Sequence, residues 1–229
     1  MKVTYLEHSG FAVECKDDVF IFDWYRGRLP EFDLKKKIYV FASHSHYDHF
    51  NKKIFEWTER YPDIRYILSA DITSDEQPEQ TTYVTANKEY HFDDIKVQTL
   101  HSTDEGVAFV VYVEDKVIYH AGDLNWWYWE EESELYNEQM RKDYQREIDK
   151  LNDIAIDVAF VPLDPRQEDQ YAWGMDYFMK HTSTKYVFPM HMWEHYEVYD
   201  RLMKNPEAVS YKDRVMQVRK PGQVFEVEI

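Results

Sequence analysis

Short apolar runs separated by polar turns dominate this chain and predict a protein rich in β-strands. The runs have the length and the β-branched or aromatic content of strands, and Gly, Asn or Asp marks many of the turns between them. The expected strands cover residues 3–6, 11–15, 19–23, 38–42, 64–69, 81–85, 89–92, 95–100, 107–113, 116–120, 158–163, 185–190, 215–219 and 224–227.

Apolar residues recur with a helical period in four further segments. They predict helices over about 52–60, 129–151, 171–181 and 194–204, the second of them within a helical segment at about 126–153. This order of elements predicts an α/β (α+β) fold in which two sheets pack face to face with helices outside. No linker or repeat interrupts the pattern, so we expect a single domain over residues 1–229.

Composition narrows the class of protein. The 229 residues, 44% of them hydrophobic and 17% aromatic, are enough for one sizeable core. No apolar run approaches the roughly 20 residues that span a bilayer, and the first residues lack the basic-then-apolar order of a signal peptide. A single cysteine, Cys15, leaves no internal disulfide. We therefore expect a protein of the reducing cytoplasm.

The charge balance limits the kinds of partner that the protein can bind. Lys and Arg total 27 against 44 for Asp and Glu, a net charge of −17. Such a charge repels nucleic acid and anionic membranes, so we expect neither as a partner. A small molecule is the expected substrate, and an anionic one remains compatible because a bound metal can invert the local field. No feature of the sequence specifies an oligomeric state.

The strongest chemical signal is the segment 43–49, which reads H-x-H-x-D-H directly after a predicted strand. In an extended backbone alternate side chains share a face, so His44, His46 and Asp48 can point to one side. A turn at the end can then bring in His49. Imidazoles and carboxylates are the ligands that divalent metals of this kind prefer, and four on one loop could serve two metals.

Three further ligand-type residues follow later strands, namely His101, Asp123 and His191. Each alone is a weak signal, but together they fit one site at one edge of a sheet sandwich. A polar loop with chance histidines is one alternative. A mononuclear structural site is another, although such sites commonly use cysteine and none lies nearby.

These motifs resemble those of the metallo-β-lactamase superfamily, and they occur in the same order over nearly the whole chain. The resemblance implies a four-layer αββα sandwich with a dinuclear metal site along one edge. It also implies two sets of metal ligands: His44, His46 and His101 for one metal, Asp48, His49 and His191 for the other, with Asp123 bridging them and Asp23 supporting the site.

Within the superfamily some activities are disfavoured. True zinc β-lactamases commonly have cysteine where Asp123 stands, and di-iron flavoproteins have glutamate where His46 stands. The RNA-processing members carry a large extra domain for which this chain has no room. The segments 8–11 and 121–125 are similar to those of ascorbate-6-phosphate lactonase-like proteins and uncharacterised bacterial metal-dependent hydrolases.

We therefore expect a dinuclear metal-dependent hydrolase, with zinc best suited and manganese or iron compatible. Two ions would bridge a water and lower its pKa, and the hydroxide would attack a carbonyl carbon or a phosphorus. Asp48 would orient the nucleophile as a catalytic residue. The expected substrate is a lactone, phosphorylated or not, or a small phosphodiester. The alternatives are a metal-binding sensor or scaffold without turnover and, less favoured, a nuclease.

Residues near the motifs are candidates for the substrate pocket. Trp126 and Trp127 follow Asp123 closely and could form an aromatic wall or simply anchor a helix. Trp193 and His195 lie just after His191 and are further pocket candidates. In addition, His8 is a candidate supporting residue or proton donor. Arg166 could hold a substrate anion or form an ion pair within its loop with Asp164.

Overall fold

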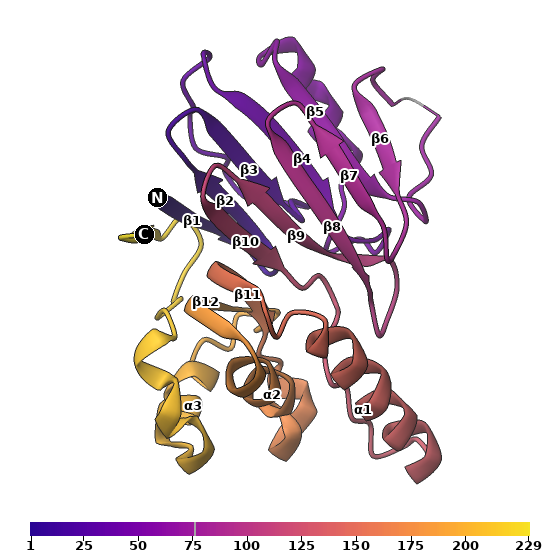
Figure 1. Cartoon of the computed structure of the whole chain (residues 1–229), viewed down its shortest axis with the longest axis vertical. Helices are drawn as coiled ribbons and strands as arrows, with labels where there is room; N and C mark the ends of the chain where they lie inside the picture. The colour runs from indigo at the N-terminus through magenta and orange to yellow at the C-terminus, as the bar shows by residue number, and fades with distance from the viewer. Residues whose placement is uncertain (76) are drawn as a thin grey trace.

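Two β-sheets face each other through the middle of the molecule (Figure 1). This computed structural model describes residues 1–75 and 77–229. The seven-stranded sheet has the order β13-β1-β2-β3-β4-β5-β6, and the six-stranded sheet has the order β12-β11-β10-β9-β8-β7. Both sheets mix parallel and antiparallel pairs, for example β3 with β4 and β2 with β3. The predicted α/β fold with two packed sheets is confirmed.

The strands of the first sheet are β1 (Lys2–Glu7), β2 (Gly10–Glu14), β3 (Asp18–Phe22), β4 (Lys37–Ala42), β5 (Ile64–Ser69), β6 (Thr81–Val84) and β13 (Val224–Glu226). Those of the second are β7 (Glu89–Phe92), β8 (Ile95–His101), β9 (Val107–Val113), β10 (Lys116–His120), β11 (Ala155–Pro162) and β12 (Ser183–Met190). The α-helices are α1 (Glu134–Asp149), α2 (Trp173–His181) and α3 (Val198–Lys204). Short 3-10 helices cover Lys52–Glu59, Pro165–Gln170, Pro206–Ser210 and Lys212–Arg214.

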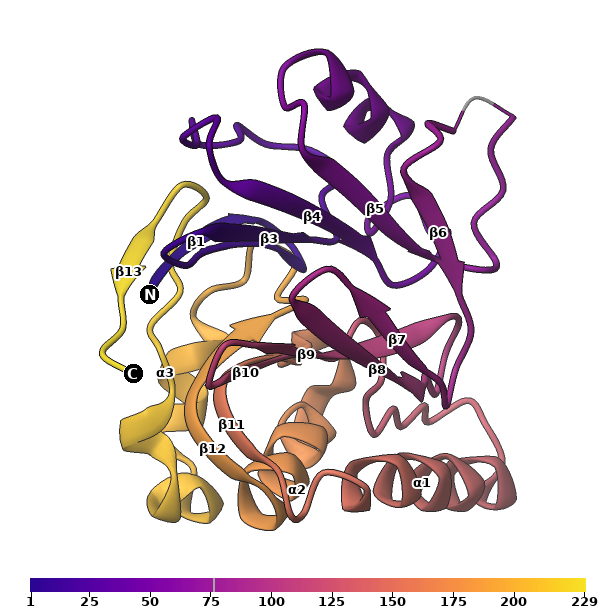
Figure 2. The same cartoon turned by 45° about the horizontal axis from the view of Figure 1, so that its top comes forward.

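Helical layers lie outside both sheets, but they are unequal (Figure 2). The three α-helices lie on the side of the six-stranded sheet, whereas the 3-10 helix Lys52–Glu59 lies on the opposite side of the sandwich. Ile54 of that helix is buried with Ile38 and Val40 of β4. The predicted helix at 52–60 is therefore of the tighter 3-10 type, with bonds such as Ile54 N to Asn51 O at 3.1 Å.

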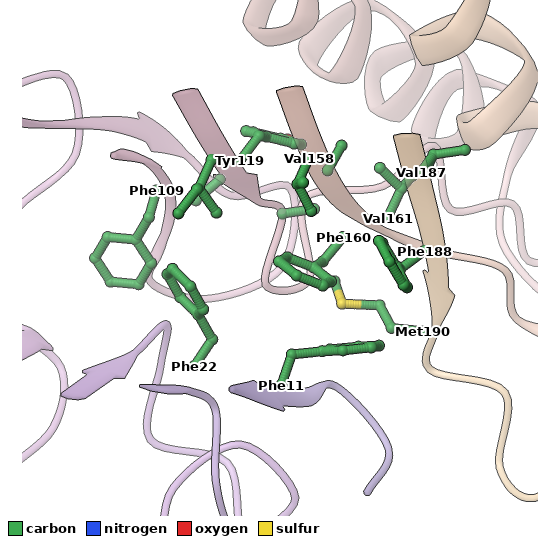
Figure 3. Close-up of a cluster of buried hydrophobic side chains, with 14 of the residues drawn as sticks. Phe11, Phe22, Phe109, Tyr119, Val158, Phe160, Val161, Val187, Phe188 and Met190 are labelled. Atoms are coloured by element: carbon green, nitrogen blue, oxygen red, sulfur yellow. The ribbon is translucent and has the colours of Figure 1, made fainter. Parts of the chain in front are cut away.

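Aromatic side chains fill the space between the sheets (Figure 3). Phe11 of β2 packs on Phe160 of β11 with ring centroids 4.3 Å apart, and Phe160 packs on Phe188 of β12 at 5.4 Å. Burying one such ring contributes roughly 1.5–3 kcal/mol. This packing holds the two sheets in one relative position, so the loops at their shared edge are also held in place.

Two sequence-based boundaries need correction. Helix α1 begins at Glu134 because the Ser133 hydroxyl caps it, accepting from Tyr136 N at 3.2 Å. Residues 126–132 are irregular instead, tied to the helix by Asn137, whose side chain bonds the backbone N and O of Trp129 at 3.1 and 2.8 Å. Helix α3 likewise begins at Val198 rather than 194.

The predicted strand at 215–219 is wrong. Only an isolated bridge joins Val215 to Val187 of β12, supported by the bond from Met216 N to Val187 O at 2.8 Å. The chain then leaves the six-stranded sheet to reach β13, which pairs with β1 in the other sheet. In the part of the chain that the structure describes, the helices are all too short or too polar to cross a membrane.

Candidate metal centre

Loops from both sheets converge at one edge of the sandwich and carry ligand-type side chains. They include His8 between β1 and β2, Asp23 after β3, His44 to His49 after β4, Asp104 between β8 and β9, Asp123 after β10, Asp164 after β11, and His191 after β12. Parallel neighbours such as β11 and β12 end at the same edge, which explains why residues far apart in sequence meet here.

Eight of these side chains form two groups that could each hold a metal ion. The first group is His8, Asp48, His49 and His191, and the second group is His44, His46, Asp104 and Asp123. Within each group the candidate ligand atoms lie within 4.8 Å of one another. Each group combines residues of the seven-stranded sheet with residues of the six-stranded sheet, so the site spans the interface between the sheets.

Asp123 lies between the two groups. Its Oδ1 atom is 3.2 Å from His49 Nε2 and 3.5 Å from His191 Nε2, both of the first group. Its Oδ2 atom is 3.6 Å from His44 Nε2 of the second group. One carboxylate therefore faces both groups with different oxygens, which is the arrangement that a bridging ligand requires.

The donor atoms fit bound cations. His8 Nε2, His49 Nε2 and Asp123 Oδ1 are buried, and among the described residues none of them has a hydrogen-bond partner. An unsatisfied buried polar group costs about 1–3 kcal/mol, and a cation between these atoms would remove that cost. Imidazole and carboxylate donors without sulfur suit zinc, manganese or iron.

Carboxylates outside the groups set the orientation of two ligand rings. His49 Nδ1 donates to Asp23 Oδ2 at 2.7 Å, and His191 Nδ1 donates to Asp164 Oδ2 at 2.8 Å. Each carboxylate thereby fixes Nδ1 of its ring as a donor, so that Nε2 of both rings faces Asp123. This is the usual way in which proteins prepare a metal-binding histidine. The sequence did not indicate Asp164 in this role.

Asp23, predicted as a supporting residue, contacts both parts of the H-x-H-x-D-H loop. It accepts from Ser43 N at 2.7 Å and from Ser43 Oγ at 2.6 Å, in addition to His49. Ser43 Oγ in turn lies 2.9 Å from His44 Nδ1. The fully buried Asp23 carboxylate thus positions His49 of the first group directly and His44 of the second group through Ser43.

The substitution Asp23→Asn should weaken metal binding at both groups, by about 10–100-fold. Both carboxylate oxygens accept hydrogen bonds, so an amide nitrogen in place of either would face donors. Competition with a chromophoric chelator would measure each affinity. As a matched variant, Asp164→Asn removes the partner of a single ligand ring, that of His191, and should weaken the first group alone. Unchanged affinity at both groups in Asp23→Asn would contradict this role.

His120 links the loops that carry His8 and Asp123. Its Nε2 donates to Ser9 O at 2.8 Å, and its Nδ1 accepts from Gly122 N at 3.1 Å. Burial lowers the pKa of His120, so the ring stays neutral and both bonds persist. Although His120 lies within a strand and outside the ligand groups, it joins the turn after β1 to the turn after β10.

The structure does not bring His101 into either group. This side chain is exposed, and its Nδ1 donates to Ser102 O at 2.6 Å. Its backbone N donates to Glu147 of α1 at 3.0 Å. The loop that follows places Asp104 beside His46 instead, with 3.7 Å between Asp104 Oδ2 and His46 Nδ1. Asp104 is therefore a ligand candidate that no sequence motif indicates.

Paired variants distinguish these two assignments. From the geometry we expect Asp104→Asn to lower the metal content of the second group and His101→Gln to leave it unchanged, because only Asp104 lies within reach of His44 and His46. Metal content after dialysis, measured by plasma mass spectrometry, gives the answer. Loss of metal in His101→Gln but not in Asp104→Asn would make His101 the ligand. It would also mean that residues 101–106 rearrange on metal binding.

Strained backbone conformations occur at the site. His8, Asp23 and His191 have φ angles of 51°, 44° and 61°, in the left-handed region that non-glycine residues rarely adopt. Each such residue costs of order 1–3 kcal/mol and persists only where its surroundings enforce it. The turns at these three residues place the site's side chains, and the sequence pattern did not reveal that geometry.

The pKa values of the ligand residues differ with their surroundings. Burial lowers the pKa of His8 and of His44 to about 4, so both rings are neutral. Burial would raise the pKa of Asp48, but contact with His8 and the charge of His49 lower it to about 2. Burial would lower the pKa of His191, but Asp123 and Asp164 raise it to about 10. A cation would therefore displace a proton from His191.

A cavity of about 370 Å³ opens over the two groups. Its lining includes ligand residues His46, Asp48, Asp104, Asp123 and His191, aromatic residues Tyr47, Trp127, Trp129, Tyr136 and Trp193, and also Thr103, Met140 and Arg166. Of the predicted pocket residues, Trp127 and Trp193 line this cavity. Arg166 forms the expected ion pair within its loop, with Asp164 at 2.6 Å, and its side chain also lines the cavity.

Two predicted pocket residues lie elsewhere. Trp126 packs against Trp173, with ring centroids 5.2 Å apart, because the irregular segment after Asp123 turns this side chain away from Trp127. His195 is exposed and pairs with Glu197 at 3.0 Å. Trp127, by contrast, is buried and its Nε1 donates to Asp123 O at 3.0 Å, so it also holds the loop of the central carboxylate.

The fold and the position of the site define a metallo-β-lactamase-fold protein. YhfI of Bacillus subtilis, described as a metallo-β-lactamase fold protein, matches with a TM-score of 0.63 and 14% identity over 98% of this chain and 99% of YhfI. Igni18, a metallo hydrolase of the archaeon Ignicoccus hospitalis, matches with a TM-score of 0.66 and 18% identity over 99% of both chains. The predicted metallo-β-lactamase fold is confirmed.

A relative found by sequence also carries the name of a metal-dependent hydrolase. A UPF0173 metal-dependent hydrolase of Desulforamulus reducens is 26% identical over 255 residues, covering 99% of this chain and 100% of that protein. No protein-family model matches the chain. The fold also occurs with another chemistry: CmlA, a diiron β-hydroxylase of Streptomyces venezuelae, matches with a TM-score of 0.54 and 11% identity over 83% of this chain and 44% of CmlA.

Proposed function

We propose that this chain is a metal-dependent hydrolase that uses two divalent ions to cleave an ester-type bond of a small substrate. The observation that carries the proposal is the pair of ligand groups that meet at Asp123 beneath a cavity. The name of the Desulforamulus reducens relative supports the same class. A lactone, phosphorylated or not, or a small phosphodiester fits the size of the cavity.

The two groups would each hold one ion, and Asp123 would contact both. When bound, the two ions would supply Lewis-acid activation of a water and polarisation of a carbonyl or phosphoryl oxygen. Asp48 lines the cavity and is ionised at neutral pH, so it can accept a hydrogen bond from an attacking water and orient it. His8 Nε2 lies 3.3 Å from Asp48 Oδ2, so these two candidate ligands of the first group are adjacent.

The cavity wall would bind the remainder of the substrate. Trp127 and Trp129 stack with centroids 6.1 Å apart, and Trp193 stands at 5.6 Å from His191. Such a wall favours an apolar or ring portion of a small molecule and keeps water from the reacting bond. A net charge of −17 disfavours nucleic acid and membranes as partners. The unpaired Cys15 fits a cytoplasmic location.

Chelator-sensitive turnover tests the proposal. Protein reconstituted separately with zinc, manganese or iron would be assayed on a lactone, a phosphodiester and a thioester, each with and without EDTA. We expect hydrolysis of one class that disappears with EDTA and returns with metal. Metal bound at two equivalents without turnover on any of the three would favour a binding protein over a hydrolase.

A nuclease is tested in the same series. An RNA oligonucleotide is added to the panel at 50 and at 200 mM salt. A protein that binds phosphates through basic residues loses affinity steeply with added salt. We expect no cleavage of the oligonucleotide at either salt concentration, and salt-sensitive cleavage would replace the small-substrate proposal by the nuclease alternative.

A further inference from the structure

We propose that Arg166 and Trp193 form an oxyanion site beside the metal centre, which receives a carboxylate or phosphate group carried by the substrate. This inference rests on the proposed hydrolase function, because it names the substrate class of the same cavity. Both residues line that cavity. They contact each other, since the Arg166 guanidinium lies over the Trp193 ring at 4.7 Å from its centroid.

Arg166 uses only one edge of its guanidinium within the protein. Nε and Nη2 donate to the buried Asp164 carboxylate, at 2.9 and 2.6 Å to Oδ2. Nη1 has no acceptor among the residues that the structure describes. Stacking on Trp193, with Trp129 at 5.9 Å on the guanidinium carbon, fixes the plane of the group. A fixed plane with a free edge is the geometry that binds an oxyanion in a bidentate manner.

Trp193 supplies a second donor without a partner. Its Nε1 atom is buried, and no acceptor reaches it in the described part of the chain. A buried indole N–H ordinarily finds an acceptor, and one left without it costs free energy. The φ angle of 50° at Trp193 holds this residue in a strained turn two positions after His191. The proposed oxyanion beside the guanidinium would supply the acceptor that this N–H lacks.

The charges in the cavity favour an anion at this end. Arg166 is the only arginine or lysine among the described residues that line it. Asp164, its partner, also accepts from His191, so the negative charge of Asp164 is shared between two donors. With two divalent ions in place, the acids Asp48, Asp104 and Asp123 would be outweighed by the cations. A substrate anion would then face positive charge from Arg166 and from the metals.

The position of Arg166 also limits the size of the substrate. A series of contacts through the Asp164 carboxylate and the His191 ring joins the guanidinium to Asp123. An anionic group at Arg166 and a reacting bond beside Asp123 would therefore belong to one small molecule. The substrate class is accordingly a small ester or lactone with a carboxylate or phosphate group at the end remote from the reacting bond.

Calorimetric binding to the metal-loaded protein tests the proposal without requiring turnover. The probes are benzoate, phenylphosphonate and the neutral benzamide, and the two anions distinguish a carboxylate from a phosphate site. We expect at least one anion to bind tenfold or more tightly than benzamide. Arg166→Gln should reduce that preference about tenfold, and Arg166→Lys should restore only part of it because lysine lacks the planar fork.

Two further variants complete the design. Trp193→Phe keeps the ring and removes the donor, and should weaken anion binding several-fold. The control is Arg146→Gln in α1, an arginine that pairs with Asp143 at 2.6 Å and lines a neighbouring cavity instead. Metal content is measured in every variant to show that the metal centre remains intact.

If Arg166→Gln keeps the full preference for anions, the metals alone account for that preference and the proposal is overturned. The absence of any preference for anions in the wild-type protein would overturn it as well. Binding that depends on Arg166 in a protein that hydrolyses no ester would contradict the proposed hydrolase function but not the oxyanion site. Hydrolysis of neutral esters with no effect of Arg166→Gln would support the proposed hydrolase function and contradict the oxyanion site.

Discussion

Replacing Asp123 with alanine is expected to remove metal binding and hydrolysis together. The Asp123 carboxylate faces His49 and His191 with one oxygen and His44 with the other, so its loss affects both ligand groups at once. Loss of a residue that only orients a ligand costs about 10–100-fold in affinity or activity, and loss of a shared ligand should exceed the upper end of that range. Metal content and turnover would be measured on the same preparations.

Asp115→Ala is the matched control for this experiment. Asp115 lies in the turn before β10, at the opposite end of the strand from Asp123, and it is exposed. Its removal should change neither metal content nor turnover. Far-ultraviolet circular dichroism would show that both variants are folded. Full metal content together with full activity in Asp123→Ala would contradict the assignment of Asp123 as the shared ligand.

Gly106→Ala should destabilise the protein strongly and disturb the second ligand group. A Cβ atom at this position would lie 1.9 Å from Ser43 O and 2.7 Å from His44 Cβ, and the φ angle is +70°. The left-handed conformation costs an alanine roughly 1–2 kcal/mol, and the overlap adds roughly 1–3 kcal/mol or more. Since Ser43 O accepts from Val107 N at 2.9 Å, the overlap would also separate two bonded loops.

Gly222→Ala separates the cost of the left-handed backbone from the cost of the steric overlap. Gly222 has a similar φ angle of +77°, but nothing lies within 4 Å of the Cβ that would be added there. Urea unfolding should therefore show a loss of about 1 kcal/mol for Gly222→Ala and about 3 kcal/mol or more for Gly106→Ala. Equal losses in the two variants would show that the backbone conformation, and not the close approach to Ser43, explains the effect.

The parts of the site that were predictable from sequence are those in which neighbours in sequence remain neighbours in space. The spacing of His44, His46, Asp48 and His49 is local, and an extended segment followed by a turn is enough to gather them. Asp123 and His191 could also be predicted, because each follows an apolar strand and strand ends meet at the edge of a sheet. The packing of the two sheets was predictable from the order of apolar strands and amphipathic helices along the chain.

The parts that were missed depend on the path of irregular backbone. Asp104 reaches His46 only because the loop after β8 is bent, with Thr103 Oγ1 donating to Asn125 O at 2.6 Å. His8, expected as a supporting residue or proton donor, joins the first ligand group through a left-handed turn that no residue pattern indicates. The irregular stretch before α1 similarly turns Trp126 outward and Trp127 inward. Such geometry is decided by tertiary contacts, which override local preference.

Because both ligand groups draw on both sheets, we expect metal binding to be coupled to the packing of the two sheets. A ligand that binds only the closed form shifts folding by mass action, adding about 1.4 kcal/mol for each tenfold excess over its dissociation constant. Amide hydrogen exchange should therefore slow on metal addition far from the ligands, in the strands whose aromatic rings meet at Phe11 and Phe160. Metal would then stabilise the packing of the two sheets as well as complete the site.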